Sequence, residues 1–521
     1  MPPSQTAKPN VAGSAPEGRL LDRAPAAAVV ILVIAGVAVR LQCLACKPFW
    51  FDESFSVEMA RMDWRNFLHL LWWREANMSL YYVLLKAWLH FGQGRFFIRS
   101  LSVVFSAATL PAVYWLARTL YSRRVGLIAA ALFAANAYSL RYAQEARSYA
   151  LFLLLATLSS GFLVAWLRWP ARRNWWGYVL ASALAAYAHF YALLLVAAQG
   201  LAMAGVGALG ATNPPELRTG ELRRAWIAIG VAVLPLLIFV GKTGAGPIKW
   251  IPRPGARDVF QLYENLAGAA NWPLLALLAC AGVAAIVPHA ASLLTRSQSW
   301  ELWRSRFLLI WLLFPVAVTV VLSFARPVFL ARYMIFCLPP VLILAAAGLA
   351  RLKPWWMLVL VLGGALVLSA QGFSYVYGRD FDDQRDASGA ASDFILDRSA
   401  VGDGIIFHIA ETRIPYEFFR SLRAGRNTAS PEFSGRLGPE ILFPRHGPGL
   451  DYRDFTGKPT EQFLRDAARS HNRLWVMLMH NGRADQPDST TVTLSRVLPE
   501  YLPQVQSWHF AKVEVRLYSS Q

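Results

Sequence analysis

Long apolar segments separated by short polar ones dominate the first 373 residues of the chain. A run of about 20 apolar residues can cross the hydrocarbon core of a membrane as a helix. The pattern predicts eleven such helices, near residues 25–45, 96–117, 124–140, 148–167, 175–188, 190–209, 225–241, 271–290, 307–325, 333–350 and 355–373. The chain is therefore predicted to be a polytopic α-helical membrane protein whose transmembrane domain covers residues 25–373.

Two amphipathic segments lie between the first and second predicted spans, within residues 46–95. MDWRNFLHLLWW and SLYYVLLKAWLHF are too short or too interrupted to cross a membrane comfortably, so they are expected to lie in its interface as helices. Two explanations fit such helices equally well. They either cover a cavity at the outer leaflet or simply anchor the chain to the membrane.

The pattern becomes polar after residue 373, and residues 374–521 are predicted to form a small α/β domain. Buried strands are expected at 402–409 and 473–479, and an edge strand at 507–518. Helices are expected in IPYEFFRSLRA, PTEQFLRDAARS and STTVTLSRVLPEYL, and a long loop at 427–458. The domain has no phosphate-binding or nucleophile motif, so no chemistry is assigned to it.

Composition supports the membrane prediction. Of 521 residues, 56% are apolar and 16% are charged, whereas soluble chains have roughly 25% charged residues. The formal net charge is +19, and its basic excess lies in the apolar region. Basic residues there indicate cytoplasmic loops or contacts with lipid phosphates. The polar domain has no basic patch of the kind that binds nucleic acid, so nucleic-acid binding is not expected.

The distribution of arginines predicts the topology. If residues 1–24 form a cytoplasmic tail, clusters such as Arg123–Arg124 and Arg172–Arg173 lie in cytoplasmic loops, as membrane proteins favour. An odd number of spans then places the C-terminal domain outside. The outer loops also carry many basic residues, which either reach lipid headgroups or bind an anionic lipid-linked substrate.

Few acidic residues remain on the outer side under this topology. They are Asp52, Glu53, Glu58, Asp63, Glu75, Glu145, Asp258 and Glu264. Two motifs stand out: Phe49–Ser54, with adjacent carboxylates among aromatic residues, and Gln144–Tyr149, which opens the predicted fourth span. A solvated loop and an ordinary helix start also explain these motifs.

Cysteine contributes little to the predicted chemistry. Cys43 and Cys46 have the spacing CxxC, but no second pair accompanies them. A structural role is therefore favoured over metal binding or redox chemistry.

Five segments together carry a resemblance to a known family. They are WFDES, NMSLYYVLLKAW, RYAQEARSYALFLLL, HFYALLL and RPVFLARYMIFCLPP. In order and topology, residues 25–373 resemble the polytopic C-type glycosyltransferases, above all the protein mannosyltransferase-like group of glycosyltransferase family 39, which is similar to the aminoarabinose transferases. The resemblance implies a polyprenyl-phosphate sugar donor, inversion at the anomeric carbon, and transfer on the outer face of a bacterial cytoplasmic membrane. The acceptor stays open among a glycan, a lipid and a protein hydroxyl.

The resemblance also implies roles for individual residues. Asp52 is expected to be the general base and Glu53 its catalytic neighbour. Because a phosphate leaves without protonation, one base and several cations are enough. The cations expected at the donor phosphate are Arg147 and Arg332, followed by Lys86 and Arg326.

Further substrate contacts are expected from Glu145, Tyr149, His189 and Tyr333, although a packing role explains His189 equally well. The mechanism requires no cofactor, although Asp52 and Glu53 together are possible ligands of a divalent metal ion. The main alternative function is a transporter or flippase for a lipid-linked saccharide, although such proteins tend to have internal repeats. A non-catalytic scaffold with an external docking domain is a third.

Overall fold

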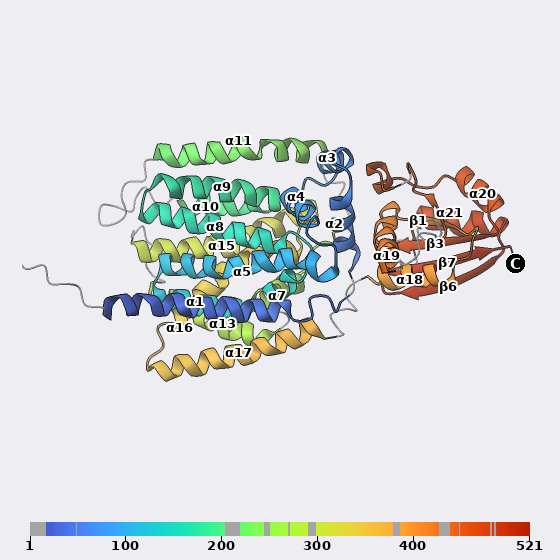
Figure 1. The fold of residues 1–521 in the computed structure, drawn as a ribbon. Coiled ribbons are helices and arrows are strands. Elements are labelled where there is room, and N and C mark those ends of the chain that lie inside the picture. The colour runs from blue at the N-terminus through green and yellow to red at the C-terminus, as the bar shows by residue number, and fades with distance from the viewer. Residues whose placement is uncertain are drawn as a thin grey trace, which may run out of the picture.

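The structure is a computed structural model that describes residues 17–47, 49–203, 219–243, 251–268, 271–289, 299–378, 386–426, 438–447, 449–479, 482–483 and 486–520. A bundle of helices occupies one part of the molecule, and a smaller domain with a sheet occupies the other (Figure 1). Residues 1–16 of the predicted tail lie outside the described residues. The rest of the tail belongs to the first helix, which begins at Glu17.

Each of the eleven predicted segments falls on a helix or helix pair of the bundle. The helices are α1 Glu17–Leu41, α5 Arg95–Leu120, α6 Arg123–Ala134, α7 Ala137–Ala143, α8 Tyr149–Arg168, α9 Arg172–Ala188, α10 Ala192–Met203, α11 Thr219–Thr243, α12 Ala256–Gly268, α13 Trp272–Ile286 with η3 Val287–His289, α15 Trp300–Ala325, η4 Ala331–Cys337, α16 Leu338–Leu349 and α17 Trp355–Tyr377. The boundary predicted at residue 374 falls inside α17.

Length and apolarity qualify six of the described helices to cross a membrane, or eight if each bent pair is one span. One bend, of 60°, separates α6 from α7. There Asn136 caps α7 by accepting a hydrogen bond from the Ser139 amide at 2.8 Å, and its amide group donates to Leu266 O at 2.9 Å. The count of eleven spans stays a prediction.

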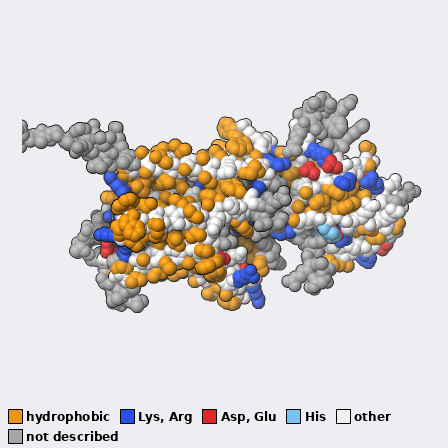
Figure 2. Space-filling view, turned by 90° about the horizontal axis from the view of Figure 1, so that it is seen from below, with side chains coloured by type: hydrophobic (Ala, Val, Ile, Leu, Met, Phe, Trp, Pro, Cys, Tyr) orange, Lys and Arg blue, Asp and Glu red, His pale blue; other side chains and the backbone are white. Residues whose placement is uncertain are grey.

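The outside of the bundle is apolar. Val231, Phe324 and Leu360 are 67%, 75% and 70% exposed, and hydrophobic side chains cover most of the bundle surface in Figure 2. Such continuous exposure is costly in water and favourable in lipid. The surface therefore agrees with a protein embedded in a membrane.

Three short helices lie across the end of the bundle next to the sheet domain (Figure 1). They are α2 Phe51–Arg61, α3 Trp64–Trp73 and α4 Ser79–Trp88. The last two match the predicted amphipathic segments, but α2 was not predicted, because its buried apolar residues are interspersed with the buried polar residues Glu53, Ser54, Ser56 and Glu58. Acidic residues in its first turn suit the positive end of the helix dipole.

The C-terminal domain has the predicted α/β composition. Its elements are α18 Ser388–Arg398, β1 Gly404–His408, η6 Ala410–Thr412, α19 Arg413–Arg426, β2 Glu440–Phe443, η8 Tyr452–Phe455, α20 Glu461–Ser470, β3 Arg473–Met479, β4 Gly482–Arg483, β5 Gln486–Pro487, α21 Ser489–Val497, η9 Leu498–Glu500, β6 Gln504–Phe510 and β7 Val513–Ser519. The main sheet has the order β2-β1-β3-β7-β6.

Two predictions about this domain were wrong. The predicted loop 427–458 contains β2, which pairs in parallel with β1. The single edge strand predicted at 507–518 is the antiparallel hairpin of β6 and β7, and β7 lies inside the sheet beside β3. The chain reverses at Lys512, whose φ of 59° permits the tight turn.

The C-terminal domain packs directly on α2. Phe418 of α19 stacks on Phe49 with ring centroids 4.9 Å apart, and Phe455 meets Phe55 edge to face at 5.3 Å. The side chain of Trp50 does not cap α2. Instead, Asp386 accepts a hydrogen bond from the Phe51 amide at 2.9 Å. The C-terminal domain thus supplies the cap of α2.

We expect Asp386→Ala to loosen the first turn of α2. Losing an N-cap side chain costs about 0.5–2 kcal/mol, and the loss should be local because Phe418 and Phe455 still hold the helix. Hydrogen exchange should show faster exchange of the Phe51 amide. Asp386→Asn, which retains an acceptor oxygen, is the control, and unchanged exchange in the alanine variant would contradict the capping role.

Candidate active site

Asp52 lies between two arginines that come from distant parts of the chain. Its Oδ2 atom is 3.2 Å from Nη1 of Arg332 and 3.7 Å from Nη2 of Arg147. The three side chains remain 12–21% exposed, so small molecules can reach them. The structure thus brings together the base and the two first-choice phosphate ligands predicted from sequence.

Helices α2 and α4 fix the guanidinium group of Arg147. Its Nη1 atom donates to the Tyr82 hydroxyl at 3.2 Å, and to Ser56 Oγ and Asp52 O at 3.4 Å each. Arg332, in η4, lies over the rings of Trp50 and Tyr333, with its Cζ atom 5.7 and 5.8 Å from their centroids. Both cations are therefore held in place before any substrate arrives.

Glu53 points away from Asp52, into the bundle. Its carboxylate is fully buried and forms two bonds with Arg99, of 2.8 Å from Nε and 2.7 Å from Nη2. Its Oε1 atom also accepts from the Ala146 amide at 2.9 Å. Successive residues of a helix point about 100° apart, so the two adjacent carboxylates face different partners. This geometry gives Glu53 a structural position rather than the expected catalytic one.

The same geometry affects the divalent metal site that the sequence suggested at Asp52 and Glu53. Both oxygens of Glu53 are engaged by Arg99, so Asp52 and Glu53 do not form a shared ligand pair. Among the described residues, no group of three His, Cys, Asp or Glu side chains could hold a metal ion.

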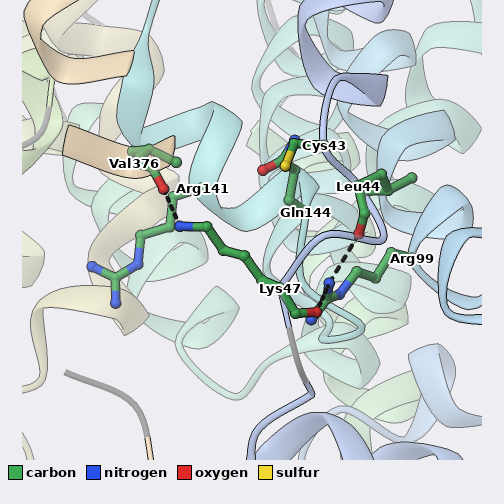
Figure 3. A pocket seen from close by; sticks show the side chains of 7 residues that line it. All are labelled: Cys43, Leu44, Lys47, Arg99, Arg141, Gln144 and Val376. Atoms are coloured by element: carbon green, nitrogen blue, oxygen red, sulfur yellow. Dashed lines mark hydrogen bonds between the residues drawn. The ribbon is translucent and has the colours of Figure 1, made fainter. Parts of the chain in front are cut away.

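Arg99 is held by the loop between α1 and α2. It donates to the carbonyl groups of Leu44 and Lys47 at 2.9 and 3.0 Å. These residues line a small pocket with Cys43, Arg141, Gln144 and Val376 (Figure 3). A disulfide joins Cys43 to Cys46 in this loop, which agrees with the structural role predicted for the CxxC pair. The disulfide itself and the role of Arg99, hidden in a predicted span, were missed.

Two second-choice cations do not join Asp52. The ammonium group of Lys86 donates to the carbonyl groups of Ala60, at 3.1 Å, and of Met62. It therefore caps the C-terminal end of α2, where a cation is favourable. Arg326 is exposed at the end of α15, and none of its described contacts involves the site.

The other predicted substrate contacts divide into two groups. Glu145 is buried and turned toward Arg141, with 3.8 Å between its Oε1 atom and the arginine Nε. Tyr149, His189 and Tyr333 form one aromatic wall beside Arg332. The His189 ring lies 4.7 Å from the Tyr333 ring and 6.3 Å from the Tyr149 ring, measured between centroids.

Glu75 is a site residue that motif reasoning missed. It lies two residues after the end of α3 and interacts electrostatically with Arg147, Arg74, Asp52 and Glu411. Burial raises the pKa of its carboxyl group to about 7, although Arg147 and Arg74 oppose the rise. Arg74 also forms an ion pair with Glu411 in η6. The only signal of Glu75 in the sequence was its predicted outer position between two amphipathic segments.

No family model matches the chain, and neither does the sequence of any curated protein. Solved structures do match. ArnT from Cupriavidus metallidurans bound to undecaprenyl phosphate is similar over 94% of this chain and 97% of that one, with 13% identity and a TM-score of 0.57. The chain has the C-type glycosyltransferase fold.

A second structure with this fold is the oligosaccharyltransferase AglB from Archaeoglobus fulgidus, in complex with an inhibitory peptide and a dolichol-phosphate. It matches 87% of this chain and 69% of its own, with 12% identity and a TM-score of 0.50. The resemblance expected from the sequence is thus confirmed for the C-type glycosyltransferase fold. The 94% coverage by ArnT extends the likeness into the C-terminal domain.

Glu75 should make stability depend on pH. Because its pKa is raised from 4.5 to about 7, the folded protein binds this proton more tightly than the unfolded chain does. The free energy of unfolding therefore falls as pH rises between these two values. Glu75→Gln should flatten that part of the profile, measured as the unfolding temperature from pH 4.5 to 8. Glu301→Gln, at the exposed start of α15, is the control. A profile unchanged by Glu75→Gln would show that its carboxyl group titrates normally.

Proposed function

We propose that this protein is an inverting glycosyltransferase of a bacterial cytoplasmic membrane. It transfers a sugar from a polyprenyl-phosphate donor to a hydroxyl group of a glycan, lipid or protein acceptor on the outer face. The observation that carries this proposal is the position of Asp52 between Arg147 and Arg332. ArnT bound to undecaprenyl phosphate and AglB with a dolichol-phosphate, which share the fold, support it.

In the proposed reaction Asp52 is the general base. It removes the proton of the acceptor hydroxyl while that oxygen attacks the anomeric carbon, and the bond from this carbon to the phosphate oxygen breaks. The leaving phosphate needs no proton, so a second catalytic acid, as in inverting glycosidases, is unnecessary. Asp52 therefore suffices as the only carboxylate at the reacting hydroxyl.

Arg147 and Arg332 stabilise the leaving phosphate. A guanidinium group forms paired, charge-assisted hydrogen bonds with phosphate oxygens, and here two of them converge on one point. They neutralise Asp52 before the donor binds. When the donor phosphate takes over these contacts, Asp52 is freed to accept a proton. Donor binding thus prepares the base for the acceptor.

The disulfide supports the proposed orientation. Disulfides form and persist in oxidising compartments outside the cytoplasm, and Cys43–Cys46 lies in the loop that leads to α2. The C-terminal domain packs on α2, so it belongs to the same side. The active site is therefore proposed to be extracytoplasmic.

We expect a reporter fused after Gln521 to report an extracytoplasmic location. Alkaline phosphatase, which needs an oxidising compartment, should be active there, because the C-terminal domain packs on the disulfide-bearing side. A fluorescent protein that matures only in the cytoplasm should stay dark at this position. Fluorescence of that fusion would overturn the orientation and, with it, the side of the membrane on which the reaction takes place.

Asp52→Asn tests the base directly. Asparagine keeps the size of the side chain but cannot take up the proton, so turnover should fall roughly 100- to 10,000-fold. Purified protein is mixed with a polyprenyl-phosphate sugar and an acceptor fraction, and release of free polyprenyl phosphate is measured. The variant should still bind the lipid donor. A flippase would move the donor and release no polyprenyl phosphate, whichever residue occupies position 52.

Glu53→Gln is the matched comparison, because it removes the adjacent carboxylate. Breaking a buried ion pair by neutralising one partner costs about 3–5 kcal/mol, so this variant should lose thermal stability. The folded fraction should turn over far faster than Asp52→Asn. Near-normal turnover in a well-folded Asp52→Asn protein would remove Asp52 as the base, and Glu75 would then be the next carboxylate to test.

A further inference from the structure

His189 carries a hydrogen-bond donor of fixed position. It lies between α9 and α10, is 1% exposed, and stacks on Phe152 with ring centroids 5.1 Å apart. Its Nδ1 atom accepts a hydrogen bond from the Tyr191 amide at 3.2 Å. An accepting Nδ1 bears a lone pair, so the neutral ring carries its proton on Nε2. The backbone thus sets the tautomer of this ring.

Two polar atoms of the aromatic wall have no protein partner among the described residues. They are Nε2 of His189 and the hydroxyl group of Tyr149, and both side chains are at most 1% exposed. A buried polar group without a hydrogen bond costs free energy, so native proteins leave few of them. Both side chains interact electrostatically with Arg147 and Arg332, the two cations that flank Asp52. Their position calls for a substrate group as the missing partner.

The local charge defines the chemistry of that partner. Burial and the positive charges of Arg147 and Arg332 lower the pKa of His189 to about 3. The ring is therefore neutral at physiological pH, and Nε2–H is a permanent donor. A hydroxyl, carbonyl or carboxylate oxygen would accept its hydrogen bond. An ammonium group offers no lone pair and cannot accept it.

We infer that Tyr149 and His189 form the subsite for the donor sugar, which accepts an oxygen-bearing substituent and rejects an ammonium group at that position. This inference rests on the proposed function and names its substrate class: neutral or acidic sugars rather than cationic amino sugars. Arg147 and Arg332 bind the phosphate, and Tyr149 and His189 contact the sugar. The specificity of the reaction then depends on a neutral histidine whose tautomer the backbone fixes.

Paired donors test the inference on the unmodified full chain. Polyprenyl-phosphate glucose is compared with the glucosamine form, and the arabinose form with its 4-amino-4-deoxy counterpart. Within each pair the hydroxyl donor should have a kcat/KM at least about tenfold higher, measured as polyprenyl phosphate release. Equal or faster turnover of both amino donors would overturn the subsite. If neither member of either pair releases polyprenyl phosphate, the proposed function itself fails, and this inference with it.

Two variants then locate the contact. His189→Phe keeps the stacked ring, and Tyr149→Phe keeps its packing, but each removes one polar group. Each should lower kcat/KM for the hydroxyl donors roughly two- to thirteen-fold and narrow the preference over the amino donors. Tyr191→Phe is the matched control, because its hydroxyl group already donates to Val328 O. It should leave that preference unchanged.

Free polyprenyl phosphate distinguishes a sugar contact from a phosphate contact. Its inhibition constant should be the same in His189→Phe and in the unmodified protein, because the imidazole meets the sugar. A loss of affinity for free polyprenyl phosphate equal to the loss for the donor would place Nε2–H on the phosphate and overturn the sugar subsite. Unfolding temperatures of all three variants are compared, so that misfolding is recognised separately.

Discussion

The buried ion pair between Glu53 and Arg99 fixes the position of α2, and the site depends on it. Both charges are withdrawn from water and satisfied by each other, by the Ala146 amide, and by the Leu44 and Lys47 carbonyl groups. Loss of either partner of a buried ion pair strongly destabilises the folded protein. It therefore allows one orientation of the first turn of α2, in which Asp52 faces Arg147 and Arg332.

The other side of α2 belongs to the C-terminal domain. Asp386 caps its first turn, while Phe418 and Phe455 pack against the aromatic residues around it. The helix is thus a shared element between the bundle and the sheet domain, and a second bridge, Arg74 to Glu411, lies near Glu75. Because it packs on α2 in this way, the C-terminal domain contributes to the geometry of the site and is not merely tethered to the membrane region.

The sequence predicted those parts of the fold that leave a simple pattern of hydrophobicity. Apolar runs located the bundle helices, and buried strands such as residues 473–479 located the sheet. Helix α2 was not predicted because four of its eight buried residues are polar. Strand β2 was not predicted because it has only four residues between glycine- and proline-containing segments. Pairings over long distances in sequence, such as Glu53 with Arg99, are set by tertiary packing, and no local pattern encodes them.

The candidate site divides in the same way. Asp52, Arg147 and Arg332 stood out because each lies in one of the segments that resemble the C-type glycosyltransferases. Lys86 shared that property, but its ammonium group is used to cap α2. The resemblance also assigned Glu53 a catalytic place beside Asp52, since the difference between these two carboxylates is one of burial and direction.

Charge balance explains why one carboxylate and two arginines suit the proposed reaction. At the start, the two guanidinium groups face the negative Asp52 and a donor phosphodiester with one negative charge. At the end, Asp52 is protonated and neutral, while the released phosphate monoester carries two negative charges. The two arginines match the total negative charge in both states. Negative charge therefore moves from Asp52 to the phosphate past fixed cations that need no rearrangement, which is how a preorganised site lowers the barrier to such a transfer.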